Sequence, residues 1–219
     1  RFEDQAVYAR DDKVLEKYNE SISLLDTVKI AKPTILIGCS GAHGAFTEEI
    51  VREMKSHVEY PIIMPLSNPI TCCEALPKDL LKWCEGKVHI AAGSPFAPVT
   101  YQKKSYTIAQ CNNAYIFPGL GLGVIACEPR KMSKTMLLAA SNALSDTWHK
   151  KKDSNSKMLL PPLNESYPEY AYEIAKAVAL QAIEEGLSNL KAKDVDDAIH
   201  RVSWDVDYYQ FEYTKCIDE

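Results

Sequence analysis

The chain has 219 residues, of which 46% are hydrophobic and 25% charged. This size and composition allow a buried core and exclude a disordered or fibrous protein. The formal net charge is −5, and no block of Lys or Arg occurs. Broad binding of nucleic acid or of anionic membranes is therefore not expected, because both need a basic surface.

The sequence carries no sign of export or of a membrane anchor. No apolar run reaches the roughly 18 to 20 residues that cross a bilayer, and residues 1–12 are charged rather than signal-like. Seven cysteines, an odd number without framework spacing, favour free thiols in a reducing compartment. We therefore expect a soluble, intracellular, cytoplasmic protein, with a mitochondrial location as the alternative for a eukaryotic source.

Three short apolar runs predict strands at residues 34–38, 61–66 and 88–92, and helical patterns separate them. This alternation is typical of an α/β protein with a parallel sheet. Because ligands bind outside the carboxyl ends of such strands, the loops that follow the three runs should share one edge and form a ligand site.

Helix signals surround and follow these strands. Thr47, with Glu48 and Glu49 behind it, predicts a helix start after the first loop. Ser133 predicts another, and small apolar residues at helical spacing over 171–183 predict a third. These later helices are interpreted as packing elements. The polar stretch 150–157 is predicted to be an exposed loop.

Cysteine and histidine side chains give no convincing catalytic or metal site. Cys39, Ser40 and His43 lie at a strand-to-helix turn, but the spacing G-x-S-x-G and an orienting acid are both absent. We predict instead that Cys39 is a small buried residue and that His43 is exposed. The other cysteines lack the paired spacing of zinc ligands, so no metal site is predicted.

Neutral amides are the strongest chemical signal. Asn112 and Asn113 precede an aromatic, apolar segment, and Asn68 follows the second strand. An amide donates and accepts, which suits a ligand with both a carboxylate and a carboxamide. Local turn bonding or loop capping is the alternative for all three. The glycines at 119, 121 and 123 lack the dinucleotide fingerprint, and a tight-packing turn is predicted there.

Five ordered motifs are similar to those of malic enzymes. They are residues 32–38 (KPTILIG), 45–49 (AFTEE), 65–69 (PLSNP), 92–96 (AGSPF) and 110–123 (QCNNAYIFPGLGLG). The resemblance extends from about residue 32 to 148 and weakly through 163. It implies a partial Rossmann-type sheet flanked by helices, with an NAD(P)-binding domain over 1–150 and a helical carboxyl-terminal extension over 151–219 packing on it.

The resemblance also implies an activity. Malic enzymes oxidise L-malate with NAD or NADP and decarboxylate the product to pyruvate, with Mg or Mn as Lewis acid. By resemblance, Asn68 and Asn113 contact malate and the nicotinamide end, and Asn112 lies on the cofactor side. Ser40, Gly41 and Ala42 pass beside the dinucleotide, where small residues allow close approach.

The match has a gap. The Tyr and Lys of catalysis, the acidic metal ligands and the first Gly-rich phosphate loop of malic enzymes have no counterpart here, so no catalytic or metal residue is assigned in this chain. We expect a truncated, proteolysed or split form that does not turn over malate alone. Residues 2–9 lack Lys and Arg for a 2′-phosphate, which favours NAD.

Three further points follow from the resemblance. The family commonly forms homo-oligomers, so the complete protein is expected to form one. Malolactic enzyme, which releases L-lactate with bound NAD, is the nearest alternative. A non-catalytic nucleotide-binding or interaction module is the alternative from another class.

Overall fold

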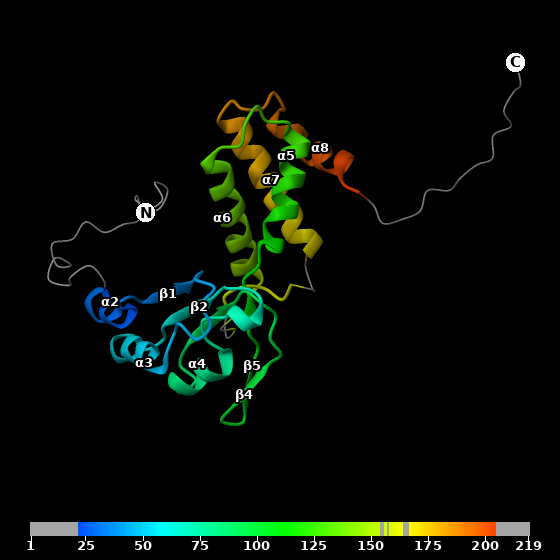
Figure 1. Ribbon diagram of the computed structural model, residues 1–219. Helices are drawn as coiled ribbons and strands as arrows, with labels where there is room; N and C mark the ends of the chain where they lie inside the picture. Colours follow the sequence, from blue (N-terminus) through cyan, green and yellow to red (C-terminus); the bar gives the residue numbers. More distant parts are fainter. Residues whose placement is uncertain (1–21, 154–155, 157, 164–166, 205–219) are drawn as a thin grey trace, which may run out of the picture. The chain divides into compact units, whose positions relative to one another are not determined.

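The structure is a computed structural model that describes residues 22–153, 156, 158–163 and 167–204 (Figure 1). These residues form two compact units. The sheet unit comprises the described residues up to 112 and those between 153 and 162. The helical unit comprises 113–152 and the described residues from 163 onward. The sequence predicted that a cofactor-binding domain ends near residue 150, and this functional boundary stays a prediction. The compact sheet unit of the structure ends earlier, at residue 112, and regains a short segment after residue 152.

A four-stranded sheet forms the centre of the sheet unit. Its order is β1 (Ile35–Gly38), β2 (Ile62–Pro65), β3 (His89–Ala92) and β6 (Ala109–Gln110), and all neighbours are parallel. The three strands predicted from apolar runs are thus confirmed within a residue or two at each end, together with the α/β class and the parallel arrangement.

Three helices accompany the sheet: α2 (Leu24–Ala31), α3 (Glu48–His57) and α4 (Pro77–Trp83) (Figure 1). Thr47 caps α3 as predicted, since its hydroxyl accepts from the Ile50 N–H at 3.4 Å. The buried side of α3 packs in one apolar core with alternate residues of the strands. The other face of β1 is open, with Ile35 and Ile37 exposed by 48% and 57%.

A short antiparallel hairpin, β4 (Val99–Tyr101) and β5 (Lys104–Tyr106), follows β3 and was not predicted. Its two turn residues, Gln102 and Lys103, both have positive φ, at 49° and 64°. Such a turn usually carries Asn-Gly or Asp-Gly. The sequence Gln-Lys gives no such signal, so the hairpin could not be recognised locally.

The helical unit contains α5 (Phe117–Cys127), α6 (Lys134–Lys151), α7 (Tyr167–Glu184) and α8 (Val195–Val202), with one-turn helices η3 (Asn113–Tyr115) and η4 (Ala192–Asp194). Ser133 caps α6 as predicted, accepting from the Met136 N–H at 3.1 Å. Because α6 continues to Lys151, the first two residues of the predicted loop 150–157 are helical. Of its remainder, residues 154, 155 and 157 lie outside the described residues.

The turn predicted at Gly119–Gly123 is wrong, because these residues lie inside α5. A Cβ on Gly119 would stand 2.6 Å from the Ala171 carbonyl oxygen, and one on Gly123 would stand 2.6 Å from that of Ala175. The glycines therefore allow α5 to approach the backbone of α7. Tertiary packing outweighs the roughly 1 kcal/mol that each glycine costs in a helix.

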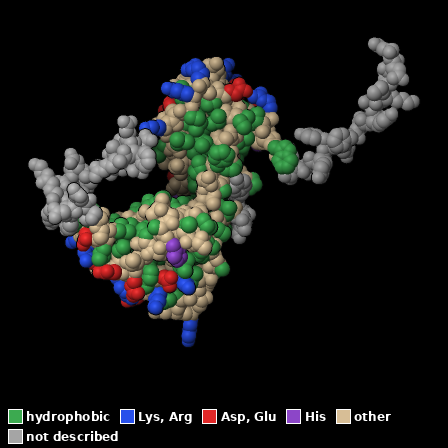
Figure 2. Space-filling view, viewed as in Figure 1, with side chains coloured by type: hydrophobic (Ala, Val, Ile, Leu, Met, Phe, Trp, Pro, Cys, Tyr) green, Lys and Arg blue, Asp and Glu red, His purple; other side chains and the backbone are tan. Residues whose placement is uncertain are grey.

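Large apolar side chains remain exposed on the helical unit, and Figure 2 shows them spread over its surface. They include Phe117, Ile125, Leu137, Leu138 and Leu180. None of the described helices combines the length and the apolar character needed to cross a bilayer.

Candidate functional site

The loops after β1, β2, β3 and β6 leave the sheet at one edge. Hydrogen bonds between neighbouring strands continue up to that edge. Leu66 N donates to Gly38 O at 2.9 Å, and Gly93 N donates to Pro65 O at 3.1 Å. Cys111 N donates to Ala92 O at 2.8 Å. The predicted meeting of the loops is therefore correct, and this edge, the carboxyl rim, is the place where parallel sheets bind ligands.

A buried carboxylate links the first two loops. Glu74 is fully buried, and its Oε1 accepts from the Ser40 N–H at 2.8 Å and from the Ser40 hydroxyl at 2.9 Å. The Ser67 hydroxyl donates to the same oxygen, and the Ser67 N–H donates to Oε2 at 3.3 Å. Glu74 thus fastens the loop after β1 to the loop after β2.

The pKa of Glu74 reflects this environment. Desolvation on burial by itself raises the pKa, but hydrogen bonds from Ser67 and Ser40 outweigh it. The pKa therefore lies below its ordinary value, and Glu74 is a carboxylate at neutral pH. Gly38 makes this placement possible, because a Cβ there would stand 2.6 Å from the Glu74 carboxyl carbon.

Asn68 is exposed on the same rim, as predicted for a ligand-binding residue. The Ser94 hydroxyl, which is buried, donates to Asn68 Oδ1. A Cβ on Gly93 would stand 2.1 Å from the Leu66 carbonyl oxygen and 3.0 Å from Asn68 Nδ2, so only glycine fits beside this amide. The oxygen of Asn68 is engaged within the protein, which leaves its NH₂ group for a ligand.

The other candidate residues divide between the two units. Ser40, Gly41 and Ala42 form an exposed loop on the carboxyl rim. Asn112 is half-buried and follows β6 in the sheet unit, whereas the exposed Asn113 opens η3 in the helical unit. The structure therefore brings Ser40, Gly41 and Asn68 to one rim. The ligand role of all six residues, Asn113 included, stays a prediction.

Two cysteines border the rim without forming a reactive pair. Cys39 is exposed, so its predicted burial is wrong: it follows the last strand residue, beyond the helices that cover β1. His43 is exposed as predicted. Burial, with a smaller contribution from Cys39, raises the pKa of the Cys111 thiol, which disfavours the nucleophilic thiolate.

Sequence reasoning assigned no role in the site to Glu74 or Ser94. Glu74 lies 34 residues from Ser40, and Ser94 lies 26 residues from Asn68. No local pattern connects partners so far apart. An indirect signal existed for Ser94 alone, since it lies in the motif 92–96 (AGSPF) just after a predicted strand.

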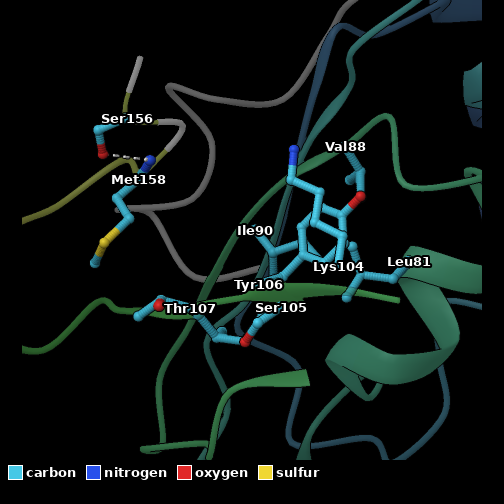
Figure 3. A pocket seen from close by; sticks show the side chains of 10 residues that line it. Leu81, Val88, Ile90, Lys104, Ser105, Tyr106, Thr107, Ser156 and Met158 are labelled. Atoms are coloured by element: carbon cyan, nitrogen blue, oxygen red, sulfur yellow. Dashed lines mark hydrogen bonds between the residues drawn. The ribbon is translucent and has the colours of Figure 1, made fainter. Parts of the chain in front are cut away.

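A separate cavity of about 270 Å³ is lined by residues of α4, β3 and β5 and by Ser156 and Met158 (Figure 3). Apolar side chains of α4 and β3, including Leu81 and Ile90, form one wall, and β5 contributes Lys104 and Tyr106. The Lys104 ammonium lies 5.4 Å from the centre of the Tyr106 ring. No residue of this cavity belongs to the predicted ligand site.

The sheet unit is a parallel α/β sheet with polar, glycine-containing loops gathered at its carboxyl ends, an arrangement found in many nucleotide-binding proteins. The chain belongs to the malic enzyme family: residues 2–183 match the family described as malic enzyme, NAD binding domain.

Curated relatives agree with this assignment. The NAD-dependent malic enzyme of Proteus mirabilis is 47% identical over 196 residues, which cover 89% of this chain and 34% of that protein. The enzyme of the same name from Acinetobacter baylyi is 48% identical over 190 residues, covering 86% and 33%. The chain thus spans about one third of the length of these relatives.

Solved structures support the fold. The malic enzyme of Entamoeba histolytica matches 88% of this chain and 39% of its own with a TM-score of 0.66 and 23% identity. The malic enzyme of Pyrococcus horikoshii matches 77% and 34% with a TM-score of 0.58 and 22% identity. These similarities concern the arrangement of the backbone.

Proposed function

We propose that the chain is the NAD-binding part of an enzyme that oxidises L-malate at its 2-hydroxyl and decarboxylates the product to pyruvate and carbon dioxide. The observation that carries the proposal is Asn68, an exposed amide oriented at the carboxyl rim by Ser94, on a chain of the malic enzyme family. NAD, when bound, supplies the hydride acceptor.

Asn68 has the central role in this proposal. Because Ser94 engages its oxygen, the NH₂ group donates to a malate carboxylate or to the nicotinamide carboxamide. Such a bond holds the substrate carbon close to the pyridine ring, and this proximity lowers the entropic part of the barrier. By family resemblance, the proposal also assigns Asn112 to the cofactor side and Asn113 to contact with malate and the nicotinamide end.

The loop of Ser40, Gly41 and Ala42 passes beside the dinucleotide in this proposal. Its small, exposed residues permit close approach of a flat or bulky ligand. NAD is preferred to NADP, in keeping with relatives that are named NAD-dependent malic enzymes and with the absence of Lys and Arg in residues 2–9.

The described residues do not fit a divalent metal ion, since they contain no group of three or more His, Cys, Asp or Glu side chains that could hold one. In the proposed function the metal ligands and the Tyr and Lys of catalysis come from other residues of a homo-oligomeric enzyme. The 219 residues alone bind NAD without turning over malate.

Nuclear magnetic resonance of the ¹⁵N-labelled chain tests the binding. We expect NAD to shift the amide signals of Ser40, Gly41 and Ala42 and the side-chain amide of Asn68. Asn68→Asp should weaken the binding, whereas Asn142→Asp on α6 provides the matched control for the change of charge. Shifts confined to the helical unit would contradict the proposal.

An activity assay tests the reaction. The chain alone should reduce no NAD in the presence of malate. A complete enzyme that contains this chain should release pyruvate, and lactate as the product would assign it to the malolactic type instead. Lack of NAD binding in both preparations would favour a non-catalytic module.

A further inference from the structure

The backbone donors of the loop at Ser40 are all used inside the protein. Ser40 N–H donates to Glu74 Oε1 at 2.8 Å, and Gly41 N–H donates to the Ser67 hydroxyl at 2.9 Å. Ala42 N–H donates to the Ser40 hydroxyl at 3.2 Å. Successive N–H groups in a glycine-containing loop normally form a cradle for phosphate. Here none of the three is left for an external anion.

Glu74 is the endpoint of this network. The hydroxyls of Ser40 and Ser67, which accept hydrogen bonds from the loop, each donate a hydrogen bond to the Glu74 carboxylate. Among the described residues, no Lys or Arg forms an ion pair with Glu74, so its negative charge is balanced by hydrogen-bond donors alone. A buried charge needs such donors, because desolvation is otherwise prohibitive.

We propose that Glu74 is a positioning residue that acts as an internal anion: it occupies the donors of the Ser40–Ala42 loop, fixes that loop to the Asn68 loop and excludes phosphate from it. The consequence for the ligand rests on the proposed function. The loop contacts an uncharged part of the dinucleotide, and the pyrophosphate binds elsewhere.

The charge of Glu74 should keep a phosphate group away from the loop altogether. A phosphate placed on the loop would lie within a few ångströms of a buried carboxylate, where like charges repel strongly. It would also have to displace hydrogen bonds that Glu74 already makes at no translational cost. Removing the charge while keeping the size of the side chain should convert the loop into an anion site.

The variant Glu74→Gln makes that change, and inorganic pyrophosphate is the probe. An NH₂ group in place of one carboxylate oxygen faces the Ser40 or Ser67 donors and repels them, which releases loop N–H groups. In the wild-type chain, millimolar pyrophosphate should leave the amide signals of Ser40, Gly41 and Ala42 unshifted. In the variant it should shift them, with an affinity gain of at least about tenfold.

Glu59→Gln is the matched control, because it removes the same formal charge from an exposed residue whose carboxylate pairs with Lys87. It should not create pyrophosphate binding at the loop. Glu74→Asp keeps the charge and should not create it either. A folded Glu74→Gln chain without the gain, or wild-type binding at these amides, overturns the proposal.

Ser67→Ala keeps the proposal testable if Glu74→Gln does not fold. It frees the Gly41 N–H but retains the Glu74 charge, so pyrophosphate should still not bind at the loop. Binding in this variant would mean that donor supply rather than charge governs the loop, and would refute the inference. Failure of the chain to bind NAD would contradict the proposed function. The pyrophosphate experiments would still test the role of Glu74, because they do not depend on NAD binding.

Discussion

Gly93 in the sheet unit and Gly123 in the helical unit both lie against a backbone carbonyl oxygen that leaves no room for a side chain. A Cβ on Gly93 would stand 2.1 Å from the Leu66 carbonyl oxygen, and one on Gly123 would stand 2.6 Å from that of Ala175. Both positions exclude a side chain because backbone cannot yield. Their surroundings differ, since Gly93 lies beside the amide of Asn68, whereas Gly123 lies in α5 against the backbone of α7.

Close packing thus supports the proposed ligand site in the sheet unit, whereas in the helical unit it contributes to stability alone. In the sheet unit, Gly38 and Gly93 make room for polar side chains that hold loops, namely Glu74 and Asn68. In the helical unit, glycines make room for an apolar helix contact. Substitutions should therefore separate stability from binding.

The largest effect is expected from overpacking at these two glycines. Gly93→Ala and Gly123→Ala should each destabilise their unit by about 3 kcal/mol, because the new methyl group strikes backbone. Denaturant unfolding measures both losses. Only Gly93→Ala should also abolish the NAD-induced shift of the Asn68 side-chain amide. Equal binding defects in the two variants would remove the proposed distinction.

The second effect concerns the pH dependence of the sheet unit. The folded pKa of Glu74 is depressed, so its stabilisation is present above the unfolded value near 4.5 and is lost as pH falls through the folded pKa. Glu74→Gln should cost roughly 2 kcal/mol at pH 7, the typical magnitude for hydrogen bonds to a charged group. The difference between the two proteins should shrink in acid.

Unfolding of both proteins by urea at several pH values provides the measurement. The exposed variant Glu59→Gln should follow the wild-type pH curve much more closely. A Glu74→Gln deficit that persists unchanged in acid would show that the carboxylate charge is not the source of the stabilisation.

A smaller effect is expected at Asn68, and it concerns binding rather than folding. Asn68→Ala should weaken NAD or malate binding about tenfold, the loss of one good hydrogen bond, and leave the unfolding curve nearly unchanged because the side chain is exposed. Ser94→Ala should weaken binding less, because it only frees the amide to rotate. Ser56→Ala on α3 is its control, and titration by nuclear magnetic resonance measures all three.

The smallest effect tests the helical unit in the opposite direction. Gly121 lies in α5 between the two packed glycines, but no atom stands within 4 Å of a Cβ built on it. Gly121→Ala should therefore stabilise the helical unit by up to about 1 kcal/mol, through helix propensity alone. Thermal unfolding measures the gain. A loss of stability at this position would contradict the packing contrast with Gly123.

Local patterns predicted much of this protein correctly. The caps Thr47 and Ser133 were identified from residue type and position because a capping hydroxyl bonds within three residues along the chain. The three strands were identified because buried parallel strands form continuous apolar runs. The Gly119–Gly123 segment and the β4–β5 hairpin were missed because their residues contradict local preference.

The sequence by itself determined the α/β class, the gathering of the strands' loops at one rim and, through its motifs, the malic enzyme family. These depend on hydrophobic periodicity and on short-range bonding, which act between neighbours in the chain. Only the tertiary structure revealed that Glu74 binds Ser40 and Ser67 and that Ser94 orients Asn68. It alone also revealed that Gly119 and Gly123 let α5 pack closely against α7. Apart from Ser67 and Glu74, which are seven residues apart, these contacts join residues distant in sequence, where burial and steric fit decide the outcome and no local preference predicts it.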